Sequence, residues 1–518
     1  MDTPSKKVPQ GPLDMETPPQ KHPQGLWVLF FTEMWERFSY YGMRALLVLY
    51  LTSLIVNGGF AYAENHALEI YGIFTGLVYL TPIIGGILAD RLIGQRKAII
   101  IGGVIMALGQ AALAYSEAVV SMGGISSPEA LQELREYWLF IGLGLIIVGN
   151  GFFKPNISTM VGRLYADGDP RKDSAFTIFY MGINLGAFLA PLVAGYLGES
   201  IGWSWGFGSV AVGMFLGTGW FWAQEKKLGT IGFGPSRTFK DDNVRMNGRD
   251  WLDIGVWILG IIAFIYLFVK VWWTLPDSTM DWIIRGTAII AISAIAYLII
   301  KNTTGKDQWS RMAAILVFCF FNVFFWSGFE QAGGTFNLFA RDMTDRMLGS
   351  FEIKASWFQS VNAIMIVGLA PVFSILWVWL GRRNPNTPVK FGLGLLLLSL
   401  GFVIMFAADT KATATNLVSP LWLVGVYLLH TMGELCLSPI GLSMISKLSP
   451  PKITSLMMGL WFASIALANY LAGALRSILE TYLPDMNLFL FLVMTSGSAA
   501  LLMFAISPWL KKLMRGLD

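Results

Sequence analysis

Charged residues are scarce in this sequence of 518 residues: Asp, Glu, Lys and Arg make up 14% of it, whereas hydrophobic residues make up 55%. Soluble domains carry roughly 25% charged residues, so the composition excludes an ordinary soluble domain. Apolar runs near or above the ~18 residues needed to cross a bilayer recur along the chain. These runs do not alternate apolar with polar residues over ~10 positions, as the strands of a membrane β-barrel do. The sequence therefore predicts an all-α polytopic membrane protein.

Cysteine and histidine are also rare, with two and three residues respectively. Cys319 and Cys436 both fall in predicted spans, which indicates small packing residues rather than a disulfide or a metal pair. His430 is the one histidine inside a predicted span, and a packing role is favoured over a proton relay. No HExxH motif and no aspartate pair occurs within a span, so we expect no enzyme, metal site or cofactor. The net charge of +4 is no argument for a nucleic-acid partner, because the basic residues lie in loops.

The first 25 residues differ from the rest of the chain, because they are polar and rich in proline. They lack the hydrophobic region and the cleavage site that define a signal peptide. We therefore expect residues 1–25 to form a disordered cytoplasmic tail.

Apolar segments between charged or Gly/Pro-rich breaks predict fourteen membrane-spanning helices, in the order six, two and six. We expect them near residues 27–55, 68–90, 98–119, 136–162, 174–198, 203–222, 251–273, 280–300, 309–340, 354–380, 389–408, 419–446, 454–481 and 486–510. The expected domains are a six-helix bundle at 26–223, a cytoplasmic loop at 224–250, an inserted two-helix hairpin at 251–301, a second six-helix bundle at 302–512 and a C-terminal tail at 513–518. Two six-helix bundles are typical of transporters that bind substrate at the midplane between their halves.

Lys and Arg are concentrated in every second loop, and this asymmetry predicts the orientation in the membrane. One basic loop carries Arg382 and Arg383, whereas the loop GESIGW (198–203) has no basic residue. The loop after residue 340 is the exception, because it carries Arg341 and Arg346. Both termini are therefore expected in the cytoplasm, as an even number of spans requires.

The segment GGILADRLIGQRKAI (85–99) follows the second span. It resembles the cytoplasmic loop motif of the major facilitator superfamily, with one extra residue between Arg91 and Gly94. An ordinary basic loop on the cytoplasmic side would explain the arginines and the lysine, but not Asp90 in the same place.

The first span carries an unusual stripe of polar residues. At ~100° per residue, Glu33, Glu36, Arg37, Tyr40 and Arg44 fall on one helical face. A charge at the bilayer centre is costly, so such residues face a partner or a water-filled cavity. The stripe predicts a cavity wall or, alternatively, a buried ion-pair network that only locks helices together.

The remaining charges inside spans differ in sign between the two halves. The first half has surplus cations at Arg44 and Lys154, and the second has carboxylates at Glu330 and Glu434. An isolated buried carboxylate tends to take up a proton unless it is paired. We therefore expect charges to pair across the halves, and such pairs can open when the halves rock.

Two motifs carry a resemblance to a known family. EMWERFSYYG (33–42) matches the ExxERFxYYG motif of the proton-dependent oligopeptide transporters, and FYMGINLGAFLAP (179–191) resembles their fifth-span signature. Ala187 stands where that family usually has serine. The resemblance implies a major facilitator fold and proton-coupled import of di- and tripeptides by alternating access. The inserted hairpin resembles bacterial members, which implies a multi-pass protein of the cell inner membrane, in contact with the lipid bilayer and functional as a monomer.

The resemblance also implies residue roles. Proton coupling would involve Glu33, Glu36, Arg37 and Glu330. Arg44 and Lys154 would bind the carboxyl side of the peptide and pair with Glu330 and Glu434 respectively, while Glu434 would receive the peptide amino group. The full set of implied peptide-binding residues is Arg37, Tyr40, Tyr41, Arg44, Tyr79, Lys154, Asn184, Trp326, Glu330, Asn362, Glu434, Ser438, Trp461 and Phe462.

One alternative within the same fold stays open, namely a proton-coupled transporter of another solute, such as nitrate, a drug or an amino-acid conjugate. A nitrate carrier needs one cationic site and has little use for a carboxylate such as Glu434. A zwitterionic peptide needs a cationic and an anionic site that face each other, and the sequence supplies both.

Overall fold

The structure is a computed structural model, and it describes residues 21–89, 93–122, 127–166, 169–233, 248–267, 293 and 296–516. The long helices are α1 (Gln24–Thr52), α2 (Glu64–Leu88), α3 (Gln95–Met122), α4 (Pro128–Arg163), α5 (Arg171–Ser200), α6 (Trp203–Gln224), α7 (Gly248–Tyr266), α9 (Gly305–Phe329), α10 (Thr335–Asp342), α11 (Gln359–Leu380), α12 (Thr387–Lys411), α13 (Leu421–Leu448), α14 (Thr454–Tyr482) and α15 (Leu488–Leu513). The short elements are η1 (Ile55–Asn57), η3 (Glu225–Leu228), η5 (Glu330–Gly333), β1 (Met347–Leu348), β2 (Phe351–Glu352), η6 (Ala355–Phe358), η7 (Gly381–Arg383) and η8 (Pro451–Ile453).

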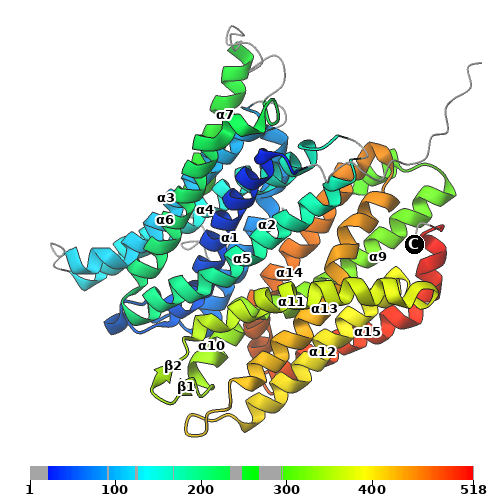
Figure 1. Cartoon of the computed structure of the whole chain (residues 1–518). Coiled ribbons are helices and arrows are strands. Elements are labelled where there is room, and N and C mark those ends of the chain that lie inside the picture. The colour runs from blue at the N-terminus through cyan, green and yellow to red at the C-terminus, as the bar shows by residue number, and fades with distance from the viewer. Residues whose placement is uncertain are drawn as a thin grey trace, which may run out of the picture.

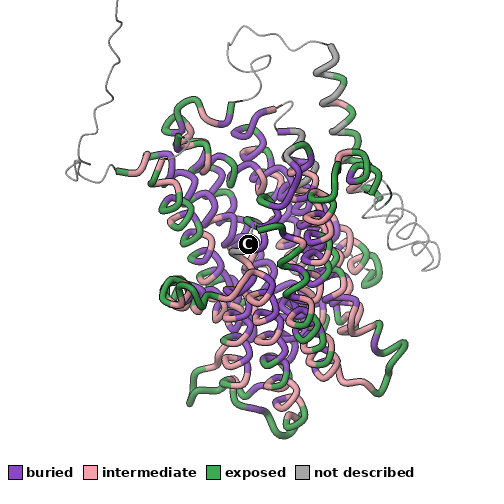
Figure 2. Tube along the Cα trace, turned by 90° about the vertical axis from the view of Figure 1, so that its right-hand side faces the viewer, coloured by how far each residue is buried: buried purple, intermediate pink, exposed green. Residues whose placement is uncertain are grey.

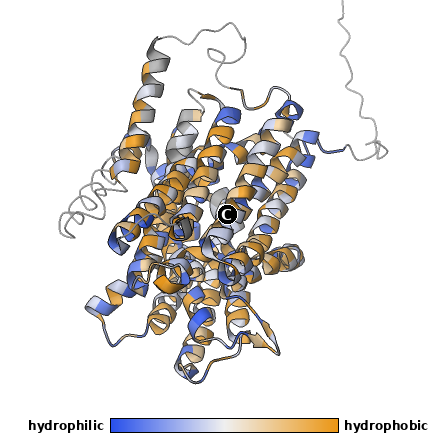
Figure 3. Ribbon diagram, turned by 90° about the vertical axis from the view of Figure 1, so that its left-hand side faces the viewer, coloured by the Kyte–Doolittle hydropathy of each residue, from blue (hydrophilic) through white to orange (hydrophobic). Residues whose placement is uncertain are grey.

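Each expected span except that at 280–300 corresponds to a helix or to the pair α9 and α10. The expected span at 280–300, most of the tail at 1–25, most of the loop at 224–250 and the residues Asp90 and Arg91 lie outside the described residues. By length and composition alone, nine helices in the described part could cross a bilayer. The apolar residues run along the helices and the hydrophilic ones gather at their ends, as Figure 3 shows.

Several helices begin where a side chain can satisfy a free backbone N–H. Ser127 accepts a hydrogen bond from the N–H of Ala130 at the start of α4, and Asn386 accepts one from Val389 at the start of α12. Such N-caps fix a helix start because the first four N–H groups have no partner within the helix.

The helices form two bundles that lie side by side (Figure 1). In the first half, α1 packs against α5 and α6, and α4 packs against α2 and α3. In the second half, α12 packs against α13 and α15, and α9 packs against α14 and α15. The halves meet where α2 packs against α14 and α5 against α11. Buried residues are concentrated inside these bundles and exposed ones at the loops (Figure 2).

Strands β1 and β2 form a small antiparallel ladder, with Met347 opposite Glu352. They lie at the end of the molecule away from α7 (Figure 1). We call this end the strand end, and the other end the opposite end. The helices α2, α11, α13 and α15 begin at the strand end, while α1, α5 and α14 finish there.

Contacts between the halves include a close approach of backbones. A Cβ atom on Gly72 of α2 would lie 2.8 Å from the Cα of Gly473 in α14. Helices come this close only where both carry small residues. The interface of α2 with α14 therefore depends on the absence of side chains at these two positions.

The predicted span at 309–340 is interrupted. The α-helix ends at Phe329, continues as the short 3-10 helix η5 and resumes as α10 after Gly334. A Cβ on Gly333 would lie 2.7 Å from Nε of Arg44, so the glycine leaves room for that guanidinium. This break places Glu330 at the point where the two halves face each other.

Candidate functional site

The polar stripe of α1 forms a buried ion-pair cluster. Arg37 Nε lies 3.0 Å from Glu33 Oε1, and Arg37 also pairs with Glu36. Glu36 Oε1 accepts a hydrogen bond from Asn150 Nδ2 of α4 at 3.3 Å. Within the described part, Glu33 Oε2 and Arg37 Nη2 are buried without a hydrogen-bond partner. The cluster thus keeps polar atoms that water or a proton can still engage.

Arg44 and Glu330 pair across the two halves. Arg44 Nη2 lies 2.6 Å from Glu330 Oε2, and Arg44 Nε donates to the Tyr71 hydroxyl at 2.7 Å. Both members of the ion pair are buried. The predicted charge pairing between the halves is therefore present at this position.

The second expected pair, between Lys154 and Glu434, is not formed among the described residues. Lys154 Nζ instead lies 4.1 Å from the ring centroid of Tyr79, as a cation–π contact. Glu434 Oε2 accepts a hydrogen bond from Asn362 Nδ2 at 3.1 Å. The contact with Tyr79 keeps the ammonium in the first half, whereas Glu434 belongs to the second half.

A cavity of about 160 Å³ lies between the halves. Its wall is formed by residues of α1, α2 and α5 on one side and of α9, η5, α11 and α13 on the other. The lining residues are Tyr41, Arg44, Tyr79, Tyr180, Ile183, Asn184, Ala187, Trp326, Phe329, Glu330, Ala332, Gln359, Asn362, Ala363, Ile366, Tyr427, His430, Glu434 and Ser438.

The cavity gathers most of the predicted peptide-binding residues. Those that line it are Tyr41, Arg44, Tyr79, Asn184, Trp326, Glu330, Asn362, Glu434 and Ser438. Glu33, Glu36, Arg37, Tyr40 and Lys154 are not among the lining residues. Tyr40 is buried beside them, with its ring centroid 5.7 Å from Arg37 Cζ and 5.4 Å from that of Tyr41.

Two aromatic residues of the predicted set lie elsewhere. Trp461 is buried, packs against Phe391 with ring centroids 6.4 Å apart and crowds Gly441. Phe462 packs against the main hydrophobic core. Neither residue lines the cavity. The indole of Trp461 packs instead among residues of the second half.

The sequence did not single out several residues of the wall. Tyr180 lies four residues before Asn184 on α5, and Gln359 lies three residues before Asn362 on α11. Tyr427 lies seven residues, or two helical turns, before Glu434 on α13. His430 also contributes to the wall. Its Nε2 lies 3.2 Å from the Leu398 carbonyl oxygen, which agrees with the predicted packing role.

A second set of contacts closes the strand end. Glu199, at the end of α5, accepts hydrogen bonds from the backbone N–H groups of Ala355 and Ser356, each at 3.0 Å, and from the Ser356 hydroxyl at 2.6 Å. Trp357 Nε1 donates to the Leu192 carbonyl at 3.1 Å. These contacts join α5 to the start of the second half's α11 region.

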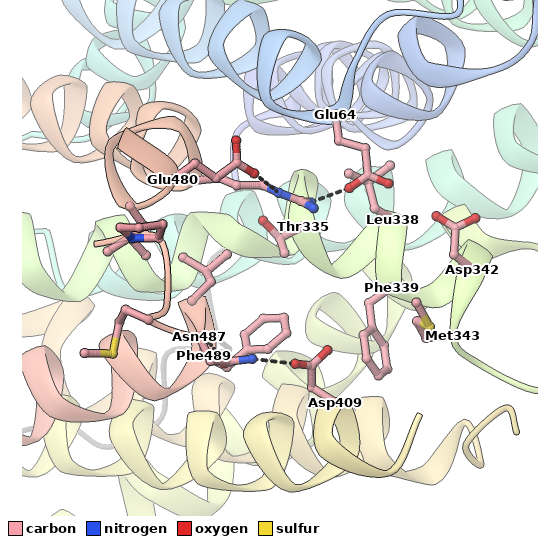
Figure 4. Close-up of a pocket in the computed structure, with 15 residues that line it drawn as sticks. Glu64, Thr335, Leu338, Phe339, Asp342, Met343, Asp409, Glu480, Asn487 and Phe489 are labelled. Carbon is pink, nitrogen blue, oxygen red and sulfur yellow. Dashed lines mark hydrogen bonds and ion pairs between the residues drawn. The ribbon is translucent and has the colours of Figure 1, made fainter. Parts of the chain in front are cut away.

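Glu64 closes the strand end at another point, beside a pocket of about 270 Å³ (Figure 4). It forms an ion pair with Arg476 of α14, and Arg476 also lies 3.3 Å from Glu480. The halves are therefore joined at the strand end by hydrogen bonds and ion pairs.

Comparison with known proteins agrees with this geometry. Residues 96–486 match the POT family. The chain is 39% identical over 507 residues to the uncharacterized transporter YclF of Bacillus subtilis (strain 168), covering 96% of this chain and 97% of that protein. It is 39% identical to the peptide transporter YePEPT of Yersinia enterocolitica subsp. palearctica serotype O:3 (strain YE-P4), covering 90% and 89%.

A solved structure is similar over nearly the whole chain. The crystal structure of a peptide transporter POT in complex with sulfate has a TM-score of 0.81 and 37% sequence identity, covering 96% of each chain. These relatives are transporters and not enzymes. The chain therefore belongs to the POT family of proton-coupled peptide transporters and has the major facilitator superfamily fold of that family.

Proposed function

We propose that this protein imports di- and tripeptides together with protons, and that it holds both ends of the peptide in the cavity between its halves. One observation carries the proposal. The cavity exposes a carboxylate, Glu434, that has an amide partner but no ion pair within the described residues, and it exposes Arg44 from the facing half. A zwitterionic peptide matches this arrangement, because its ammonium needs an acceptor and its carboxylate needs a cation.

Proton coupling depends on ion pairs, such as Arg44 with Glu330, in which a carboxylate neutralises the cation that the peptide would bind. When Glu330 takes up a proton, its attraction for Arg44 falls, and the guanidinium becomes available to the peptide carboxylate. Glu33, Glu36 and Arg37 act in the same way two to three helical turns before Arg44, through carboxylates that share one guanidinium. Lys154, held against Tyr79, supplies a further positive charge on the first-half side.

Alternating access follows from the contacts between the halves. The bundles at 26–223 and 302–512 rock about their interface, so that the cavity opens first at one end and then at the other. The excess of basic residues in alternate loops supports an orientation with both termini in the cytoplasm of a bacterial cell and the strand end outside the inner membrane. In that orientation the contacts that join the halves at the strand end close the outer side, and a single chain in the bilayer contains the complete pathway.

The test is uptake of labelled dialanine into proteoliposomes that contain the purified protein. We expect accumulation when the proton gradient is directed inward, and competition by other dipeptides at the same site. Without a gradient, net uptake should stop when the dialanine concentrations inside and outside the proteoliposomes are equal. No gradient-dependent uptake, combined with no competition by dipeptides, would defeat the proposal and favour another solute for the same fold.

A further inference from the structure

Three hydrogen-bonding groups in the wall of the cavity have no partner among the described residues. They are Trp326 Nε1, Gln359 Nε2 and the Tyr427 hydroxyl, and each of these atoms is buried. They come from three helices of the second half, α9, α11 and α13. Buried polar groups in folded proteins are almost always paired, so unpaired groups around one cavity indicate that a bound molecule or water completes them.

Two of these groups lie on a different level of the cavity from Glu434. Tyr427 and Glu434 are seven residues apart on α13, which is two turns along one face and about 10 Å along the axis. Gln359 precedes Asn362 by three residues on α11, which is about one turn and 4.5 Å along the axis. Because α11 and α13 both begin at the strand end, Tyr427 and Gln359 lie closer to that end than Asn362 and Glu434.

The two levels offer complementary chemistry. Glu434 and Asn362 form the level that can accept hydrogen bonds from an ammonium group. The amide of Gln359 and the hydroxyl of Tyr427 are neutral donors, which suit a carbonyl or carboxylate oxygen. Tyr427 is 2% exposed, so a hydrogen bond made there would be largely protected from competition by bulk water.

The separation of the levels corresponds to a particular length of peptide. An extended chain spans ~3.3–3.6 Å per residue, so three residues reach about 10 Å and two residues reach about 7 Å. A tripeptide bound through its ammonium at Glu434 can therefore bring its last oxygen atoms to the level of Tyr427. A dipeptide bound in the same way ends before it.

We infer that Tyr427 is a specificity-determining residue that favours tripeptides, because it donates a hydrogen bond to the oxygen atoms of the third residue. This inference rests on the proposed peptide transport and adds a basis for selection by length. It assigns Tyr427 no part in proton coupling, since its hydroxyl forms no hydrogen bond with the acidic residues of the cavity in the described part.

The experiment compares labelled dialanine with labelled trialanine in proteoliposomes under one fixed proton gradient. The variants are Tyr427→Phe, which removes the hydroxyl and keeps the ring, and Gln359→Met, which removes the amide and keeps the length. We expect KM for trialanine to rise about threefold to tenfold in Tyr427→Phe, the range for one neutral hydrogen bond, while KM for dialanine changes less than twofold. Gln359→Met should raise KM for both peptides by similar factors, because its amide lies within reach of either length. The matched control is Tyr50→Phe, because the Tyr50 hydroxyl is paired with Ser116 at 2.7 Å away from the cavity.

The outcomes separate this inference from the proposed function. A ratio of the two KM values that stays at the wild-type value in Tyr427→Phe overturns the inference and assigns this hydroxyl to water alone. An equal rise for both peptides in Tyr427→Phe also overturns it. Failure of the wild-type protein to accumulate dialanine would instead defeat the proposed function. An unchanged KM for dialanine shows that the Tyr427→Phe variant is folded.

Discussion

Glu64 at the start of α2 binds two arginines of the other half. It forms an ion pair with Arg476 of α14, and its Oε1 lies 3.9 Å from Nη2 of Arg341 in α10. Arg341 also donates to the Thr52 hydroxyl at 2.6 Å. One carboxylate therefore connects α2 with two separate helices of the second half at the strand end.

Replacing this carboxylate should favour opening of the strand end. In Glu64→Gln both arginines lose their anionic partner in the first half and keep only those within the second half, Glu480 and Asp342, while the side chain at 64 keeps its size. Partly exposed ion pairs contribute up to ~1 kcal/mol, so we expect a shift of up to about fivefold in the ratio of open to closed molecules. Spin labels at Val56 and Tyr482, which are 86% and 76% exposed, report this ratio as a distance distribution once Cys319 and Cys436 have been replaced by alanine.

Asp342→Asn is the matched control, because Asp342 pairs with Arg341 inside the second half, 2.7 Å from its Nε. This variant also removes a carboxylate beside an arginine, but it breaks no ion pair between the halves. A distance distribution that changes as much in the control as in Glu64→Gln would contradict the role of Glu64.

Removing a carboxylate from the α1 cluster should uncouple transport from protons. Glu33→Gln and Glu36→Gln can no longer gain or lose a proton at these positions, so we expect loss of gradient-driven dialanine accumulation. Counterflow, which exchanges labelled for unlabelled peptide without a gradient, should remain. The control is Glu133→Gln on the exposed surface of α4, which should keep both activities. Gradient-driven accumulation that persists in both cluster variants would show that the proton binds elsewhere.

The pair of Arg44 and Glu330 should contribute strongly to stability in this conformation. Breaking a buried ion pair by removing one partner costs about 3–5 kcal/mol, because the remaining charge is left uncompensated. Thermal unfolding in detergent should therefore occur at a clearly lower temperature for Glu330→Gln. The exchanged pair Arg44→Glu with Glu330→Arg should recover part of the loss.

The control for this measurement is Asp169→Asn, in a loop. Asp169 Oδ2 lies 2.7 Å from Nη2 of Arg171, and both side chains reach solvent. Loss of this pair should leave the unfolding temperature close to that of the wild-type protein, because water screens exposed ion pairs. If the exchanged pair is no more stable than Glu330→Gln alone, attraction between the two charges does not account for their contribution.

The turn with β1 and β2 should remain ordered in a mildly acidic medium. The hydrogen bond from Lys354 lowers the pKa of Glu352, and the charge of Arg346 lowers it further. Since the pKa in the folded state lies below the unfolded value, the stabilisation is present above the usual pKa of glutamate and disappears as the pH falls through the folded value. Protection of the Ile353 amide, which donates to the Arg346 carbonyl at 2.8 Å, should be equal at about pH 7 and pH 5.5.

Hydrogen exchange, corrected for its intrinsic dependence on pH, measures this protection. It should decrease only below about pH 4, where glutamate takes up a proton. In Glu352→Gln the same amide should show no such decrease. Protection that falls between pH 7 and pH 5.5 in the wild-type protein would rule out this role for Glu352.

The sequence indicated the charged residues of the site, because a charge inside a membrane-spanning helix is energetically unfavourable without a partner. The stripe on α1 and the excess of acids in the second half predicted that charges pair across the halves, because buried charges need partners. The family resemblance then implied two pairs, of which Arg44 with Glu330 is formed and Lys154 with Glu434 is not. Opposite charge says that two residues can pair, but only the positions of α4 and α13 decide whether they are close enough.

Neutral polar and aromatic residues gave weaker signals. The family resemblance implied that Trp461 lines the cavity, although an apolar helix gives little indication of which face a tryptophan occupies. Gln359 and Tyr427 were missed because a single amide or hydroxyl costs far less to bury than a charge. The break at η5 in the span expected at 309–340 was also missed, although Gly333 and Gly334 are weak helix formers that stand at the break.

The contact of Gly72 with Gly473 has a consequence for the energy landscape of transport. Long side chains at a moving interface interlock, and each change of state must then pull them out of their rotamer wells. At Gly72 and Gly473 no side chains interlock, so α2 and α14 can rotate against each other with a low energy barrier. In the proposed transport cycle, the preferred conformation is then set by the charge state of the carboxylates that bind protons and peptide.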